Sequence, residues 1–300
     1  MNEKHLTHDY RNASGPVPIR MTNDYLFKAL LQKNERVLKA LICSVLHLDK
    51  DEIHEVEILN PIILGAHVDD KDVILDVRVL FDNAATVDLE MQVANQKNWK
   101  ERSLYYACRN YTELKSGAGY VKAIPSIQIG FLDYTLFPEH PAFCSSYRLR
   151  EDREYYTYTD KLAIYVVDLT EIELATEADR KYETDKWAAL FRATNWEEVK
   201  MLAAGNTAID EAAETVYHLS EDERIRQICE AREDYMRIQD DIKTIRERLE
   251  QEKVQLEAEL EQKDAELEQK DVQLEQKDAE LEQKDAVIRQ LQEQLAALQG

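Results

Sequence analysis

The spacing of apolar residues along the chain alternates between helical and extended patterns. From Thr22 to about Leu48 they recur three and four positions apart, and Asn23 or Asp24 can cap the predicted helix. A strand is predicted over residues 53–59, and alternation with period two predicts a β-hairpin with strands at 73–81 and 86–93 and a turn at 82–84. A helix over 98–116 and buried strands over 124–132 and 162–167 follow. This order predicts a mixed α/β fold.

The chain divides into four predicted regions. Residues 1–20 are polar, contain Gly15, Pro16 and Pro18, and predict a flexible N-terminal arm. The α/β core is predicted over 21–170, and amphipathic pieces predict a C-terminal helical lobe over 171–237. Residues 238–300 predict one long heptad-repeat helix.

The last region is built from a seven-residue unit, Ala-Glu-Leu-Glu-Gln-Lys-Asp, that begins at Ala258 and Ala265 and returns at Ala279. Its apolar positions are seven apart: Leu260, Leu267, Leu274, Leu281, Ile288 and Leu295. With these at position a of a heptad, position d is lysine at 263, 270, 277 and 284, which leaves half of a coiled-coil seam apolar. Two alternatives remain, a weak parallel homodimer or a solvated single helix held by Glu–Lys pairs.

Charge and cysteine content limit the function classes. The formal net charge is −22, of which residues 241–300 carry −8 and the remainder −14. Because affinity for phosphate comes largely from Lys and Arg, a DNA-binding role requires a local basic face or bound divalent cations. The four cysteines show no metal or disulfide spacing. No signal peptide or membrane-spanning run is visible, so we expect a cytoplasmic protein without a membrane partner.

Acidic side chains share one face of the predicted hairpin. A turn that pairs Phe81 with Ala85 places Asp76 opposite Glu90, with Cβ atoms about 4.5–5.5 Å apart. Two carboxylates this close repel each other unless a cation neutralises them, and a divalent ion with oxygen ligands does so. The alternative is an ordinary amphipathic hairpin with a solvated polar face, on which Arg78 neutralises both acids.

Four short motifs carry a family resemblance. Asp76 followed by Glu90-Met-Gln92 resembles the catalytic hairpin of the PD-(D/E)XK nuclease superfamily, with Gln in place of Lys. The four motifs are residues 23–28, 72–78, 87–92 and 102–106. Taken together, they make the chain similar to the recombination-promoting nuclease family, also described as PD-(D/E)XK transposases. The similarity covers residues 20–235 and implies a restriction-endonuclease-like core.

The resemblance implies roles for particular residues. Asp76 and Glu90 would bind one or two Mg2+ ions, for which Mn2+ could substitute, and Gln92 would orient water without supplying the charge of the usual lysine. Arg102, in the Arg-Ser-Leu-Tyr-Tyr motif, is the preferred source of that charge, ahead of Lys97 and Lys100. Its alternative role is a salt bridge to Asp76 or Glu90 in an inactive protein. Asp24 could add an acid to the site or cap its helix.

The resemblance implies a Mg2+-dependent DNA endonuclease linked to recombination, mobile elements or defence, with DNA as partner. The heptad repeat, which lies outside the resemblance, favours a homodimer formed through the C-terminal helix. The alternative is a catalytically weak binding or scaffold protein that keeps the fold and assembles through that helix. One group of aromatic residues could stack on unpaired bases or pack in the core: Trp99, Tyr105, Tyr106, Tyr111 and Tyr120.

Overall fold

A computed structural model of the chain describes residues 9–49, 52–60, 62, 77–82, 84–95, 97–112 and 120–299. It divides into two units, Met1–Arg237 and Ile238–Gly300. The strands are β1 (Val56–Ile58), β2 (Val77–Phe81), β3 (Ala85–Gln92), β4 (Ser126–Leu132), β5 (Cys144–Arg148) and β6 (Leu162–Asp168). The α-helices are α1 (Asp24–Lys33), α2 (Glu35–Leu46), α3 (Trp99–Tyr111), α4 (Glu177–Lys181), α5 (Thr184–Arg192), α6 (Trp196–Ala203), α7 (Thr207–Glu221) and α8 (Glu223–Gln299). Short 3-10 helices are η1 (Tyr10–Asn12), η2 (Tyr120–Lys122) and η3 (Ile172–Leu174).

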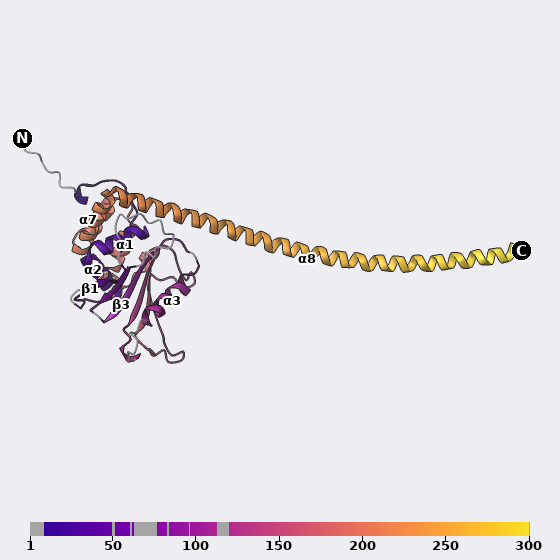
Figure 1. The fold of residues 1–300 in the computed structure, drawn as a ribbon, viewed down its shortest axis with the longest axis horizontal. Coiled ribbons are helices and arrows are strands. Elements are labelled where there is room, and N and C mark those ends of the chain that lie inside the picture. Colours follow the sequence, from indigo (N-terminus) through magenta and orange to yellow (C-terminus); the bar gives the residue numbers. More distant parts are fainter. Residues whose placement is uncertain are drawn as a thin grey trace, which may run out of the picture. The chain divides into compact units, whose positions relative to one another are not determined.

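The strands form one mixed sheet (Figure 1), and their order in it is β1-β2-β3-β4-β6-β5. The pairs β1–β2, β2–β3 and β5–β6 are antiparallel, and β3–β4 and β4–β6 are parallel. The carboxyl ends of β3, β4 and β6 therefore lie at one edge of the sheet. The expected α/β fold is confirmed.

One face of the sheet is apolar. Val87, Leu89 and Met91 of β3, with Ile129 and Phe131 of β4, belong to a single buried cluster that includes residues of α1, α2, α5, α6 and α7. Phe131 also meets the rings of Phe27 and Phe191 at centroid distances of 5.5 and 5.4 Å. Because this cluster covers one face of the sheet, the polar side chains of β3 lie on the opposite face.

The predicted helix from Thr22 onward is two helices. α1 ends and α2 begins at Asn34, whose backbone (φ −132°, ψ 96°) is extended and whose side chain accepts a hydrogen bond from the backbone N–H of Val37. Apolar spacing continued through this residue, so it did not reveal the break, although Asn is a favoured N-cap. The strand β5 was not predicted, because the segment is half-exposed and lies at the sheet edge next to β6.

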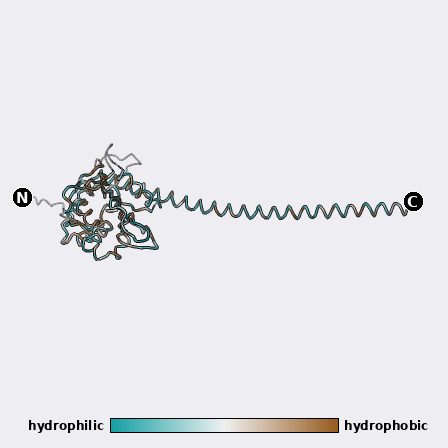
Figure 2. Tube along the Cα trace, turned by 90° about the horizontal axis from the view of Figure 1, so that it is seen from below, coloured by the Kyte–Doolittle hydropathy of each residue, from teal (hydrophilic) through white to brown (hydrophobic). Residues whose placement is uncertain are grey.

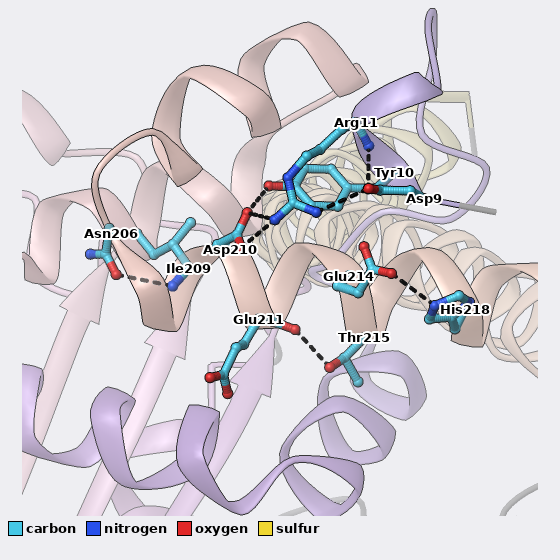
Figure 3. Close-up of polar contacts among 10 residues, drawn as sticks. All are labelled: Asp9, Tyr10, Arg11, Asn206, Ile209, Asp210, Glu211, Glu214, Thr215 and His218. Carbon is cyan, nitrogen blue, oxygen red and sulfur yellow. Dashed lines mark hydrogen bonds and ion pairs between the residues drawn. The ribbon is translucent and has the colours of Figure 1, made fainter. Parts of the chain in front are cut away.

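Residues 9–20, which we expected to be a flexible arm, lie on the helical part of the first unit. The Tyr10 ring is buried, and its hydroxyl donates to Asp210 on α7, where the Arg11 guanidinium also binds (Figure 3). The Val17 backbone N–H donates to the Thr194 carbonyl at 3.0 Å. Apolar side chains within this polar segment, including Val17 and Ile19, belong to the buried core.

α8 begins in the first unit and extends to Gln299. Over residues 238–294 its side chains are predominantly exposed, and single hydrophobic residues interrupt a hydrophilic helix (Figure 2). The heptad positions Leu260, Leu267 and Leu274 are 61%, 56% and 57% exposed. Despite its length, neither α8 nor any other helix in the described ranges is apolar enough to cross a bilayer.

Candidate active site

The hairpin register agrees with the predicted turn. Phe81 pairs with Ala85, and the ladder continues to Val77 opposite Leu89. Asp76, the next residue of the predicted strand, lies outside the described residues. Glu90 and Gln92 of β3 point to the face opposite the apolar cluster, as strand alternation requires.

Helix α3 covers this polar face. Arg102 lies one turn into α3, and its guanidinium Nη2 donates to the Glu90 carboxylate and to the Gln92 side-chain carbonyl. The Arg102 and Glu90 side chains are 27% and 15% exposed, so solvent screens the ion pair only in part. Three of the predicted site residues therefore lie together: Glu90, Gln92 and Arg102.

A second polar pair fixes the far end of α3. Asn110 donates from its amide to the Asp88 carboxylate, and both side chains are buried. Asp88 also faces Arg78 across the hairpin. The polar face is thus enclosed by a helix, which differs from the solvated face of the simple amphipathic alternative.

The start of α3 is positioned by a close approach of Trp99 to Gly130. Gly130 pairs with Glu90 in the parallel β3–β4 ladder. A Cβ atom at Gly130 would lie 2.2 Å from Cζ2 of the Trp99 indole, so no larger residue fits without movement of the helix. Because Arg102 follows Trp99 by three residues, the same contact sets where the guanidinium meets Glu90.

Polar groups continue along the carboxyl edge of the parallel strands. Gln92, Leu132 and Asp168 form one row across β3, β4 and β6. Asp168 is buried and accepts hydrogen bonds from the Thr170 backbone N–H and hydroxyl at 2.8 and 2.6 Å. It therefore serves the turn after β6.

Tyr134 lies beside this row, in a small cluster with Trp99, Leu132 and Val166. Its hydroxyl oxygen is buried and has no hydrogen-bond partner among the described residues. Burial first, and then the negative charge of Glu90, raise the pKa of the Tyr134 hydroxyl above its ordinary value, while the charge of Arg102 opposes the shift. Tyr134 stays protonated and can only act here as a neutral hydrogen-bonding group.

The site can attract a cation. Its oxygen donors, the Glu90 carboxylate and the Gln92 amide carbonyl, are the kind that Mg2+ prefers, and the Arg102 guanidinium already binds both of them. Within the described ranges no three His, Cys, Asp or Glu side chains form a metal-binding group. Any metal site here would need Asp76, or solvent and substrate oxygens, to complete it.

Asp24 and most of the aromatic group lie in other surroundings. Asn23 caps α1, and the Asp24 carboxylate binds Arg232 of α8. Trp99 is buried at the site, whereas Tyr105 and Tyr120 are 63% and 88% exposed. Helical spacing alone did not separate these two environments.

Sequence reasoning did not identify Gly130, Asn110 or Tyr134 as parts of the site. One signal was available for Asn110. The positions of α3 that face the sheet hold Trp99, Ser103, Ala107 and Asn110, and the small and polar members of this stripe fit a sheet face that carries charge. Tyr134 gave no signal, because its place depends on how β4 ends.

The sequence model of one protein family, described as PD-(D/E)XK nuclease family transposase, matches residues 21–248. No curated protein and no solved structure gives a significant match to the chain. The match begins just before α1 and includes the whole sheet, α3 and the first part of α8.

Proposed function

The chain belongs to the PD-(D/E)XK nuclease family transposases, and from this premise we propose that it is a Mg2+-dependent DNA endonuclease that hydrolyses phosphodiester bonds. In this proposal Asp76 and Glu90 are the metal ligands, and Gln92 and Arg102 complete the catalytic group. Mn2+ would substitute for Mg2+. The biological purpose would be recombination, mobility of DNA or defence against foreign DNA.

The observation that carries the proposal is the position of Arg102. Its guanidinium binds the Glu90 carboxylate and the Gln92 amide oxygen together, so a cationic group already lies where a family member is expected to bind metal. The same group replaces the positive charge that Gln92 lacks relative to the lysine of the family pattern. The pairing of Phe81 with Ala85 supports the register from which Asp76 was assigned to Glu90.

Each residue has a distinct part in hydrolysis. A divalent metal held by Asp76 and Glu90 would polarise the scissile phosphate and lower the pKa of the attacking water. Gln92 would orient that water by accepting its hydrogen bond through the amide oxygen. Arg102, released from Glu90 and Gln92, would donate to the phosphate oxygens, where charge accumulates in the transition state.

The proposal is tested by incubating supercoiled plasmid with the full-length protein and Mg2+. We expect nicked or linear product with wild type, and a loss of at least about 100-fold in rate for Asp76→Asn and Glu90→Gln. Both changes keep the size of the side chain and remove its charge. Glu57→Gln is the matched control, because Glu57 is an exposed carboxylate on the edge strand β1, away from α3.

Two results would contradict the proposal. One is a plasmid left intact by wild type with either Mg2+ or Mn2+. The other is cleavage by Asp76→Asn and Glu90→Gln at the wild-type rate, which would assign the activity to a different site or to a contaminant.

A second candidate function rests on the exposed leucines of α8. A nuclease fold with a glutamine in place of the family lysine, and with its glutamate paired to arginine, could serve as a scaffold that assembles through the tail. Under this reading the protein would form homodimers yet leave DNA uncut. The plasmid assay distinguishes the two functions, and the molar mass of the tail-truncated chain tests whether assembly depends on the tail.

A further inference from the structure

Five exposed hydrophobic side chains lie on two short segments outside the candidate active site. Tyr120 and Val121 of η2 are 88% and 90% exposed, and Tyr155, Tyr156 and Tyr158, between β5 and β6, are 68%, 60% and 81% exposed. These five residues are called the tyrosine rim below. Aromatic side chains usually bury most of their surface. The exposure of four tyrosine rings on two short segments therefore suggests that these rings have a binding role.

The two segments are held side by side. The Lys161 ammonium Nζ donates to the backbone carbonyls of Val121 and Ala123 at 2.9 and 2.8 Å. The Lys161 carbonyl in turn accepts from the Ser126 backbone N–H at 2.8 Å. Lys161 therefore ties η2 to the end of the β5–β6 connection, so both segments lie at the end of the sheet where β4 and β6 begin.

The β5–β6 connection is an ordered structure. Its backbone carries a bridge between Arg150 and Thr157, and hydrogen bonds join Glu151 N–H to Tyr156 O and Tyr158 N–H to Leu149 O at 3.0 Å. Tyr155 adopts a left-handed backbone conformation (φ +58°), which is uncommon for a non-glycine residue. The rings of Tyr155, Tyr156 and Tyr158 are thus exposed on a segment with a defined backbone conformation.

The chemistry of the surface fits nucleic acid. Residues 120–122 and 148–161 carry five basic and four acidic side chains, whereas the whole chain has a net charge of −22. One of those acids, Glu151, accepts from the backbone N–H groups of Arg153 and Glu154 at 2.9 and 2.6 Å. Exposed Lys122, Arg150 and Arg153 lie within a few positions of the tyrosines in the sequence, and aromatic side chains combined with cations are the features that bind unpaired bases.

We propose that the tyrosine rim binds an unpaired stretch of the DNA on which the nuclease acts, with bases stacked on Tyr120, Tyr156 and Tyr158. This inference rests on the proposed function and adds the form of the substrate to it. Intact duplex hides the faces of its bases, so the rim would select single strands, frayed ends or junctions over continuous duplex. A docking surface for protein fits less well, because polar or charged residues flank the tyrosine positions along 153–160.

Fluorescence anisotropy of the full-length protein in EDTA, with a labelled thymidine 20-mer and a labelled blunt duplex, tests the proposal without cleavage. Each change Tyr120→Ala, Tyr156→Ala and Tyr158→Ala is expected to weaken single-strand binding about 5- to 100-fold, because one stacked base is lost. The corresponding Phe variants should bind as wild type does, and duplex binding should stay constant. Met201→Ala, at a 72% exposed position on α6, is the control.

Three outcomes would overturn the inference. The Ala variants could bind the 20-mer as tightly as wild type while plasmid cleavage persists, which would leave the proposed function intact. The Ala variants could instead change the molar mass in solution, which would assign the rim to protein contacts. Wild type that neither binds nor cuts DNA would refute the rim and the proposed function together.

Discussion

The Trp99 indole lies against the Cα atom of Gly130, so closely that a Cβ there would come within 2.2 Å of Cζ2. This contact joins the start of α3 to the strand next to Glu90. Gly130→Ala should therefore displace α3, lower the free energy of unfolding by about 1–3 kcal/mol, and reduce nicking by separating Arg102 from Glu90. Thermal denaturation and the plasmid assay measure the two effects.

A double variant distinguishes a steric effect from other causes. Trp99→Leu removes the indole that the new methyl group meets, so Gly130→Ala should cost less in the Trp99→Leu background than in wild type. Equal costs in both backgrounds would show that the two residues act independently.

Arg102 is expected to be the source of the positive charge. Arg102→Ala should lower the cleavage rate about 100-fold, since a transition-state donor is lost. Adding Gln92→Lys to that variant restores the family pattern at this position, and we expect it to recover part of the rate. Faster cleavage by Arg102→Ala alone would show that the ion pair with Glu90 is inhibitory.

The ion pair between Asp24 and Arg232 joins α1 to α8, and both side chains are less than one-fifth exposed. Arg232→Met should destabilise the folded unit by about 1–3 kcal/mol, because the Asp24 carboxylate is left partly buried and unpaired. Cleavage per folded molecule should not change. A loss of activity in stable Asp24→Asn protein would instead identify Asp24 as an acid of the active site.

Cysteine reactivity should follow burial. Burial, with negative charge nearby, raises the pKa of the Cys144 and Cys229 thiols to about 12, so both stay protonated and unreactive at pH 8. Cys43 is buried and Cys108 is exposed on α3. A disulfide exchange reagent at pH 8 should label Cys108 rapidly and the others only after denaturation. Rapid labelling of Cys229 in native protein would contradict its burial.

The tail is predicted to form the homodimer. Truncation after Arg237, where the first unit ends, should give a monomer by light scattering, and full-length protein should give twice the mass of one chain. Replacing the d-position residues Lys263, Lys270, Lys277 and Lys284 with Leu should strengthen assembly, because each adds an apolar layer to the seam. Equal monomeric masses for the full-length and truncated chains would support a solvated single helix.

The sequence predicted local features of the site better than features that depend on packing. Strand alternation separated Glu90 and Gln92 from Leu89 and Met91, and the turn predicted the pairing of Phe81 with Ala85. The alternation and the pairing register both follow from the local geometry of a β-strand, in which successive side chains point to opposite faces. The family match to residues 21–248 confirms the resemblance carried by the short motifs.

Features that depend on contacts between distant segments were not visible. The fit of Trp99 on Gly130 joins a helix to a strand 31 residues away, and neither residue type signals the other. Likewise, Trp99 and Tyr105 are both aromatic residues of α3, but Trp99 is buried and Tyr105 is exposed. The difference depends on which side of α3 faces the sheet. The prediction for Asp76 falls outside the described residues and stays a prediction.

The two faces of the sheet are held by different forces. The face with Phe27, Phe131 and Phe191 is held by an apolar cluster, whose contribution weakens on cooling. On the α3 face one ion pair, Arg102 with Glu90, and one hydrogen bond from Asn110 to the Asp88 carboxylate accompany a much smaller apolar group. A kosmotropic salt such as sulfate strengthens apolar burial and screens the part-exposed pair of Arg102 with Glu90, whereas the buried pair of Asn110 with Asp88 is screened much less. Sulfate should thus act on the two faces in opposite directions, and amide exchange at the start of α3, around Arg102, should accelerate while exchange in α1 and α2 slows.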